Sequence, residues 1–512
     1  MKRFVEGVSR DQVSFLPECL DDFIDEDNPA RVVDVFVDGL DLRDLGFDRI
    51  DPRSTGRPSY HPSVLLKLYI YGLDLRDLGF DRIDPRSTGR PSYHPSVLLK
   101  LYIYGYLNRV QSSRRLEREA GRNVEVMWLI GRLAPDHKTI ADFRKNHGKA
   151  IRKVCSQFVE LCRRVGLLTS ASVAIDGSKF KAVNNRDRNY TKAKMARRMK
   201  QIEESVERYL HQLDSADRQE PTTAIKSRVT RIHEKIDKLQ EEMKRLKALE
   251  IEMMASPDEQ ISLTDPDARS MATSGRGSGV VGYNVQAAVD TEHHLIVAHD
   301  VIQSGSDRAQ LAPMAEKAKI ALGVDEIDVV ADRGYFSAEQ ILECDQANIT
   351  PTLPKPMTSG NRKKGLFVKQ DFRYDVNGDV YICPAGEPLR HHTTTVEKGL
   401  TIRRYWTNVC HKCSIKERCT TGKERRVTRW EHEHLIERVQ QRLDNTPQAM
   451  RVRRETVEHP FGTLKMRMGA THFLMKRLRN VKTETALNVL AYNLTRVINI
   501  MGVQPLMAAM RA

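Results

Sequence analysis

The sequence lacks any run close to the ~18 to 20 apolar residues that a membrane-spanning helix requires. Its first residues, Met1-Lys2-Arg3-Phe4-Val5-Glu6, also lack the apolar segment of a secretory signal, so we expect the protein to stay in the cytoplasm. Cysteine is scarce, with eight among 512 residues. Four of them are scattered and are expected to be buried thiols in a reducing compartment: Cys19, Cys155, Cys162 and Cys344.

Positive charge is what the sequence has in excess. Lys and Arg total 83 against 68 Asp and Glu, which gives a formal net charge of +15 and a pI near 9.4. The 40% of hydrophobic and 29% of charged residues are typical of a soluble globular chain, and this length favours roughly two to four folded units. The charge favours a polyanionic partner, first of all nucleic acid, although many basic proteins bind no particular polyanion.

Two apolar runs end in an aspartate. The runs Ala171-Ser172-Val173-Ala174-Ile175 and Ile327-Asp328-Val329-Val330-Ala331 are followed by Asp176-Gly177 and by Asp332-Arg333-Gly334. Each pattern predicts a short buried strand ended by a turn, which places an acid at the mouth of each strand. Together with a helical glutamate, Glu458, two such aspartates would suit a site for divalent metal ions.

Glu458 lies between cations in a stretch predicted to be helical. Arg454, Glu458 and Lys465 follow one another at spacings of four and seven, so on a continuous helix all three project from one face. A solvated amphipathic helix with ordinary ion pairs is the alternative. The two upstream aspartates favour a shared site.

At these residues the chain resembles bacterial insertion-sequence DDE transposases, in the group whose third acid lies in a Tyr-x2-Arg-x3-Glu-x6-Lys signature. Arg454, Glu458 and Lys465 match that spacing, and the turn Asp332-Arg333-Gly334-Tyr335 matches the surroundings of the second acid. Arg451 stands at the tyrosine position, which leaves the role of the tyrosine unfilled. The resemblance runs from about residue 35 to the C-terminus.

The resemblance implies an enzyme that binds the terminal inverted repeats of its element and cleaves and joins double-stranded DNA, target DNA included. Asp176 would bridge two Mg²⁺ (or Mn²⁺) ions, and Asp332 and Glu458 would each complete one. Arg454 and Lys465 would hold the DNA backbone beside the metals. The protein would act as a homodimer at the bacterial nucleoid.

The expected fold class is mixed α/β (α+β). It comprises a ribonuclease H-like catalytic domain with an N-terminal all-helical domain, a coiled-coil hairpin insertion and a Cys-rich insertion. Strands are predicted at 282–290, 295–301 and 350–353, and helices at 307–322, 337–347 and 485–501. The expected divisions are a lead-in at 1–39, a helical DNA-binding domain at 40–168, a catalytic core at 169–194 and 255–356, the hairpin at 195–250, the Cys-rich insertion at 357–445 and the C-terminal helices at 446–512.

A 33-residue segment occurs twice, because residues 40–72 recur unchanged as residues 73–105. Solenoid repeats diverge and need about three copies to bury a shared core, so two identical copies indicate a tandem duplication. The apolar helix at 97–102 runs on into Tyr106-Leu107, and we therefore expect the downstream copy to sit in the core. Upstream residues predicted to be short of partners are Val64, Leu65, Leu66 and Leu68.

The residues after the repeat show helical spacing to about residue 165. The resemblance makes this region a DNA-binding module, whose natural phosphate contacts are Arg109, Arg114, Arg115 and Arg118. A merely solvated basic face is the alternative. Heptad patterns at 195–213 and 225–246 predict an antiparallel helical hairpin, for which we favour a structural or dimer-forming role over DNA contact.

The other four cysteines cluster as Cys-x26-Cys-x2-Cys-x5-Cys: Cys383, Cys410, Cys413 and Cys419. Four thiolates suffice for one tetrahedral structural Zn²⁺. Unliganded thiols, or a set that includes His391, His392 or His411, are the alternatives.

Two rival functions stay open. One is a ribonuclease H-like nuclease that cuts without strand transfer, and the other is a non-catalytic DNA-binding relic of a decayed element. The acid triad argues against the relic and the duplication argues for it.

Overall fold

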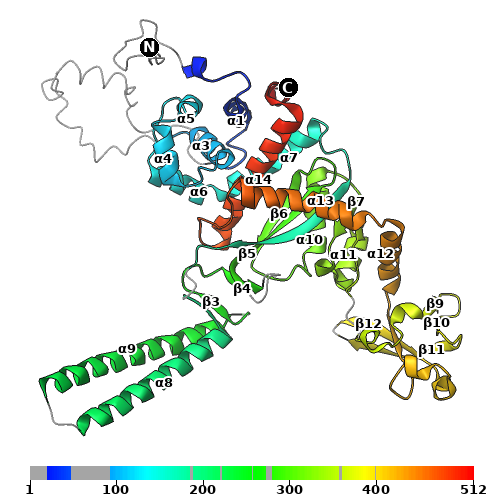
Figure 1. Cartoon of the computed structure of the whole chain (residues 1–512). Coiled ribbons are helices and arrows are strands. Elements are labelled where there is room, and N and C mark those ends of the chain that lie inside the picture. The colour runs from blue at the N-terminus through cyan, green and yellow to red at the C-terminus, as the bar shows by residue number, and fades with distance from the viewer. Residues whose placement is uncertain are drawn as a thin grey trace, which may run out of the picture. The chain divides into compact units, whose positions relative to one another are not determined.

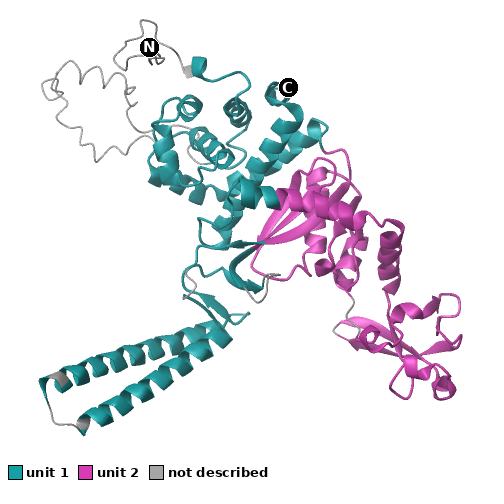
Figure 2. Cartoon of the chain, viewed as in Figure 1, with its two compact units in different colours: residues 1–167, 179–283, 462–512 teal, residues 168–178, 284–461 magenta. Residues whose placement is uncertain are grey.

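The structure is a computed structural model, and it describes residues 20–47, 93–184, 188–218, 222–256, 258–272, 279–356, 360–397 and 399–511 (Figure 1). The chain divides into two compact units, residues 1–167, 179–283 and 462–512 in one and residues 168–178 and 284–461 in the other (Figure 2). Within the described ranges no helix is long and apolar enough to cross a membrane. The six predicted domain divisions stay a prediction.

The first unit contains a bundle of helices, which confirms the predicted N-terminal helical region. Its helices are α1 (Pro29–Asp38), α3 (Pro95–Leu107), α4 (Ser113–Ala120), α5 (Val124–Leu129), α6 (His137–Asn146), α7 (Gly148–Arg164), α14 (Leu478–Met501) and α15 (Val503–Arg511), with a 3₁₀ turn at Leu20–Phe23. Ten of the thirteen residues of α3 are buried, so it is the central helix. Helix α14 packs on both α3 and α7, and α15 packs on α1.

Two buried charged side chains in this bundle form hydrogen bonds with neighbouring groups. Inside it, the buried guanidinium of Arg144 donates from Nη1 to the Tyr106 hydroxyl over 2.8 Å. The buried carboxylate of Glu484 accepts the backbone N–H groups of Leu474 and Met475. Burial raises the pKa of Glu484, and the nearby Arg144 charge lowers it. Cys155 and Cys162 are buried here and Cys344 is buried in the other unit, as predicted, while Cys19 lies outside the described residues.

The two copies of the repeat both contribute to the bundle, which corrects the expectation that only the downstream copy would. From the downstream copy, residues 95–105 form α3. From the upstream copy, residues 40–47 are described, and Leu42, Leu45 and Phe47 are buried. The Phe47 ring stacks on Phe143 at 5.7 Å between centroids. The described structure therefore uses the start of one copy and the end of the other, and the upstream apolar residues 64–68 lie outside the described residues.

A six-stranded mixed sheet carries the aspartates. Its strands are β1 (Ser172–Lys181), β4 (Arg269–Ala272), β5 (Gly279–Asp290), β6 (Ile296–Ile302), β7 (Ile327–Ala331) and β8 (Ile349–Thr352). The order is β4-β5-β1-β7-β8, with β6 paired to β5. Strand β7 runs parallel to β1 and β8, and β5 runs antiparallel to β4 and β6. The predicted strands and the mixed α/β class are confirmed.

Helices connect the parallel strands, as parallel pairing requires. Helix α10 (Leu311–Leu322) precedes β7 and packs on β6 and β7, and α11 (Ala338–Gln346) precedes β8. Both were predicted within a few residues. Most of their buried side chains are apolar, among them Leu311, Met314 and Ile341, so these helices add a largely hydrophobic layer to the sheet.

The heptad segments form two long helices, α8 (Lys192–Asp217) and α9 (Thr223–Met254), which pack against each other (Figure 1). Their seam buries Met195, Ile202, Leu246 and Met253. Arg198 and Glu242 form a two-pronged ion pair across it, with both distances 2.9 Å. The short strands β2 (Asn189–Thr191) and β3 (Gln260–Ser262) pair at the open end of the hairpin. The helices are as predicted, and their role stays a prediction.

The second unit also contains a five-stranded antiparallel sheet, in the order β13-β12-β11-β10-β9. The strands are β9 (Arg373–Asp375), β10 (Val380–Ile382), β11 (Pro388–Glu397), β12 (Leu400–Trp406) and β13 (Val427–Trp430). Short 3₁₀ turns lie at Arg333–Tyr335, Arg362–Lys364, Lys369–Asp371, Asn408–Lys412 and Lys416–Arg418. Helices α12 (Glu433–Asn445) and α13 (Ala449–Gly462) follow, and α13 carries Glu458.

Candidate active site

The two aspartates lie at the ends of neighbouring parallel strands. Strand β1 buries Val173, Ala174 and Ile175, and an apolar, partly β-branched run of this kind favours a central strand. Ile175 is opposite Ala331 in the parallel register. The next residues along the two chains, Asp176 and Asp332, therefore emerge at the same edge of the sheet.

One guanidinium lies between these carboxylates. Arg453, from α13, has its Nη2 2.6 Å from Asp176 Oδ1 and 4.0 Å from Asp332 Oδ2. The Arg453 side chain is 15% exposed, against 23% for Asp176 and 46% for Asp332, so the closer pair is largely shielded from water. A single positive group thus offsets two like charges.

Asp176 is the more perturbed acid. Burial raises its pKa to about 6, although the Arg453 charge and the N–H of Gly177 favour the carboxylate. The charges of Asp332 and Asp307 raise it further. The Gly177 N–H donates to Asp176 Oδ1 over 2.9 Å, which helps to hold that oxygen in place. A carboxyl group with a pKa near neutrality, set by burial and two other acids, is typical of a functional site.

A buried polar network beneath the aspartates was missed at the sequence level. Asp307 Oδ1 accepts hydrogen bonds from Asn284 Nδ2 and Gln286 Nε2, each over 2.7 Å. The Gln286 Oε1 atom accepts the hydroxyl of Tyr335, which follows Asp332 in the turn. Burial raises the pKa of Tyr335 well above its usual value, so this hydroxyl keeps its proton and donates. The network ties the turn after Asp332 to β5.

Gly177 is where the network approaches the backbone most closely. A Cβ atom there would lie 2.2 Å from Gln286 Nε2 and 2.7 Å from Asp307 Oδ1. A side chain at this position would therefore force the Gln286 and Asp307 side chains out of their present positions, and the Asp176-Gly177 pair was the one sequence signal that could have pointed to a crowded layer below.

Glu458 is exposed on α13, as is Arg454. Among the described residues no group of three or more His, Cys, Asp or Glu side chains is assembled as metal ligands, so the structure brings Asp176 and Asp332 together and does not join Glu458 to them. Sequence reasoning selected Arg454, whereas the arginine that contacts the aspartates is its neighbour Arg453.

Lys465 does not continue the α13 face, which corrects the expectation of one shared face. Helix α13 ends at Gly462, and a π-helical turn covers Thr463–Arg467. Spacing by 3.6 residues per turn does not apply across that junction. The Nζ of Lys465 donates to the backbone carbonyl of Lys179 over 3.1 Å and lies 4.6 Å from the centre of the Phe180 ring.

The four N-terminal arginines are surface residues. Arg109, Arg114, Arg115 and Arg118 are exposed, while Leu116 and Ala120 of α4 are buried. Helix α4 therefore presents a basic face to solvent and an apolar face to the bundle. Such a face has the charge required for phosphate contacts.

One transposase family description matches the N-terminal part of the chain. The description "Transposase domain (DUF772)" matches twice, at residues 18–76 and 73–146, and each match contains one copy of the repeat. No curated protein matches the chain. A solved structure described as "Cryo-EM structure of piggyBac transposase synaptic complex with hairpin DNA (SNHP)" aligns over 91% of this chain and 81% of that chain, at 10% identity and a TM-score of 0.29.

The description "Transposase DDE domain" matches residues 174–494, a range that includes both strand-end aspartates and all of α13. DDE transposases are DNA transposases that use divalent metal ions. Since the matched range covers more than half of the sequence, the chain belongs to the DDE transposase family.

Proposed function

We propose that this transposase binds the ends of its own insertion sequence and catalyses metal-dependent cleavage and strand transfer there. The observation that carries the proposal is the pair Asp176 and Asp332, which emerge from adjacent parallel strands and share one cation. The Arg453 guanidinium lies where carboxylate oxygens stabilise a positive charge. Carboxylate oxygens are also the ligands that Mg²⁺ and Mn²⁺ prefer.

Two divalent ions bound there would activate the attacking oxygen and neutralise charge on the leaving oxygen of a phosphodiester. Asp176 would contact both ions, and Asp332 and Glu458 would each complete one. Arg453 and Glu458 are five residues apart, which is about 140° around an α-helix. In the structure α13 turns Arg453 toward the strand ends, and we propose that Glu458 joins the two aspartates only when metal and DNA bind.

DNA contacts would come from exposed cations. Arg454 on α13 and Lys465 on the π-helical turn are proposed to hold the DNA backbone near the reacting phosphate. Arg109 and the α4 arginines would contact phosphates of the terminal repeats, and the net charge of +15 would assist association with DNA. We propose a homodimer, since two ends must be processed together, with the α8–α9 hairpin as the dimer-forming element.

The test is cleavage of linear DNA that carries both ends of the element, in the presence of Mg²⁺. We expect Asp332→Asn to lower the cleavage rate by roughly a thousandfold or more, because a lost metal ligand removes several kcal/mol of transition-state stabilisation. DNA affinity should stay within a few-fold, because it depends on phosphate neutralisation elsewhere. The matched control is Asp328→Asn, an exposed carboxylate on the same strand, which should cleave normally.

Glu458 needs its own test because it does not contact the other acids. Glu458→Gln should abolish cleavage, and Glu455→Gln on the same helix should not, since Glu455 is an exposed partner of Arg451. Cleavage by Glu458→Gln at the wild-type rate would remove Glu458 from the site. Undiminished cleavage by Asp332→Asn would overturn the proposal as a whole.

The duplication favours a second candidate function, that of a non-catalytic relic that still binds the DNA ends of the element. A wild-type protein that binds the ends but neither nicks nor joins them would support the relic. Cleaved ends that never join to target DNA would instead identify a nuclease without strand transfer.

A further inference from the structure

The five-stranded sheet of the second unit has a very small core of its own. Among the described residues, its hydrophobic cluster consists of Phe372, Tyr381, Leu389, Tyr405 and Val427. A core of this size rarely holds a fold by apolar burial alone, and small bodies of this kind usually contain a disulfide or a metal ion. Cys383 and Cys419 are packed against this core, and the cysteines are free rather than disulfide-bonded.

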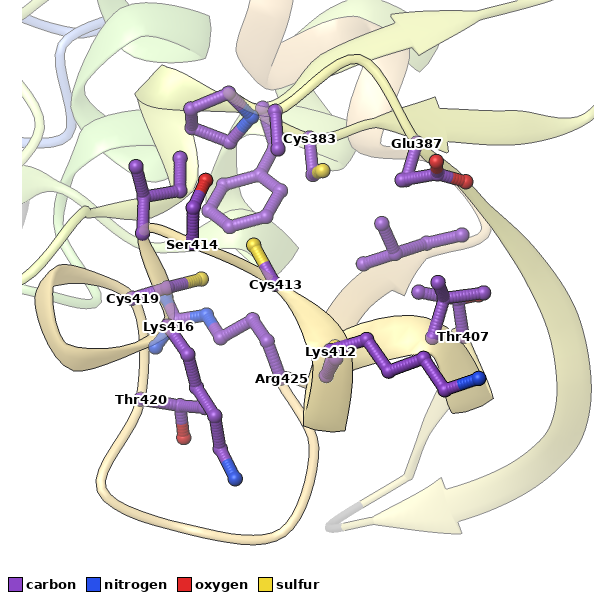
Figure 3. Close-up of a pocket in the computed structure, with 17 residues that line it drawn as sticks. Cys383, Glu387, Thr407, Lys412, Cys413, Ser414, Lys416, Cys419, Thr420 and Arg425 are labelled. Carbon is purple, nitrogen blue, oxygen red and sulfur yellow. The ribbon is translucent and has the colours of Figure 1, made fainter.

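Four thiols line one cavity beside this core. Cys383 follows β10, Cys410 and Cys413 belong to the turn at 408–413, and Cys419 follows the turn at 416–418. The cavity has a volume of about 220 Å³. Figure 3 shows Cys383, Cys413 and Cys419 around this space. Three separate chain segments thus place cysteines around the same cavity.

The backbone forms tight turns at these cysteines. The Gly386 N–H donates to the Cys383 carbonyl over 2.8 Å, and Gly386 has a left-handed φ of 85° that favours glycine. The Cys413 N–H donates to the Cys410 carbonyl over 3.3 Å, and the Cys419 N–H donates to the carbonyl of Lys416 over 2.9 Å. A Cys-x2-Cys pair on a tight turn is the spacing that structural zinc sites use.

The charges around the cavity are those that a bound tetrathiolate would need. Zn²⁺ with four thiolates carries a net charge of −2, and cations nearby stabilise such a centre. Lys412, Lys416 and Arg425 line the cavity, against a single acid, Glu387 (Figure 3).

The neighbouring histidines are engaged elsewhere. His392 stacks on Trp406 at 4.0 Å between ring centroids. His411 Nδ1 lies 2.7 Å from the carbonyl of Asn408, and His391 Nε2 lies 2.9 Å from the Thr394 hydroxyl. None of the three lines the cavity. The donor set is therefore four sulfurs.

We propose that Cys383, Cys410, Cys413 and Cys419 bind one structural Zn²⁺ that holds the five-stranded sheet together. Among the described residues, the cysteine side chains are not close enough together to form a metal site in the structure. Zinc binding would therefore move the turns at 408–413 and 416–419 inward and make the cavity smaller. This site is independent of the carboxylate site and of transposition.

The experiment uses the full chain, prepared under reducing conditions from cells grown with zinc. We expect about one zinc per chain by elemental analysis. Replacement by Co²⁺ should give the intense thiolate-to-cobalt absorption of a tetrahedral site. Cys410→Ser should lose the zinc and expose residues 408–426 to protease, whereas the matched control Cys344→Ser, a buried thiol of the same unit, should keep both zinc and protection.

Zinc-free protein that also fails to take up Co²⁺ would overturn the proposal, as would iron in place of zinc, or full zinc retention by Cys410→Ser. The wild-type measurements stand even if the variant does not fold. Because no readout involves DNA cleavage, failure here leaves the transposase proposal intact, and the reverse also holds.

Discussion

Asp176→Asn should stabilise the metal-free protein while removing its activity. The folded-state pKa of Asp176 is raised to about 6 from an ordinary value of 3.8, with burial as the main cause. The difference of about two pH units corresponds to roughly 3 kcal/mol, because each unit is worth ~1.4 kcal/mol. The ionised carboxylate thus costs the folded state about this much at neutral pH, even with Arg453 beside it, and the neutral amide removes that cost.

The sign of the pH dependence follows from the raised pKa. The protonated carboxyl favours the folded state, and this contribution is complete below the unfolded pKa and is lost as the pH rises through about 6. Asparagine resembles the protonated form at every pH. The gain from Asp176→Asn should therefore be small near pH 4, grow between pH 4 and 6, and level off at roughly 3 kcal/mol above pH 7. The charged groups that face Asp176 are Arg453, Asp332 and Asp307.

Urea unfolding at pH 5 and pH 7.5 without added divalent metal would measure the gain, and hydrogen exchange of peptides that contain β1 and β7 would localise it. The gain at pH 7.5 should be about twice that at pH 5. Asp328→Asn, on the exposed side of β7, is the control and should change stability by less than about 0.5 kcal/mol at either pH. A loss of stability at pH 7.5, or a gain that does not depend on pH, would refute the reasoning.

Three further variants test other parts of the fold. Gly177→Ala should destabilise the sheet edge and abolish cleavage, since its Cβ would lie 2.2 Å from Gln286 Nε2; normal cleavage and unfolding temperature would contradict this. Ile236→Asp, at a position 6% exposed in the hairpin, should open α8–α9 to protease, while Leu210→Asp, at a position 48% exposed, should not. Deletion of residues 40–72 yields the same sequence as deletion of 48–80 and shortens the connection from Phe47 to Tyr93 from 45 residues to 12. The deletion should raise soluble yield and leave DNA binding unchanged. The shorter loop should increase the free energy of unfolding of the bundle by roughly 1 kcal/mol, because closing a shorter loop costs less entropy. A lower free energy of unfolding would show that the extra residues are needed.

The strand-end aspartates could be predicted from the sequence because the signal is local. A β-branched apolar run followed by Asp-Gly or Asp-Arg-Gly specifies both a strand and its end, and parallel strands in one sheet bring such ends together. The long helices α8 and α9 could also be predicted, since a heptad pattern that continues over several turns indicates a helix that packs against another helix.

The buried network could not be predicted in this way. Asn284 and Gln286 lie inside an apolar strand, where they only lower the regularity of the pattern. Their partner Asp307 precedes α10. Aspartate is common near the start of a helix, so its presence there does not indicate a buried network. The antiparallel register of β5 with β6 and the short distance from Gly177 to Gln286 and Asp307 bring these three polar residues together. Both features depend on contacts between residues far apart in the sequence.

The identity of the site arginine shows where motif spacing stops being informative. The spacing of Arg454, Glu458 and Lys465 fixes their positions relative to one another on an ideal helix, but it does not fix which side of that helix meets the sheet. Buried residues of α13, among them Thr456, Val457 and Pro460, define the inward side, and Arg453 precedes these three by three, four and seven residues. These spacings place Arg453 at the middle of the inward side, where it contacts the aspartates. Arg454 is about 100° further around the helix and is exposed. The apolar residues of α13 thus set which side of the helix faces the sheet. A motif made of charged residues does not predict that side.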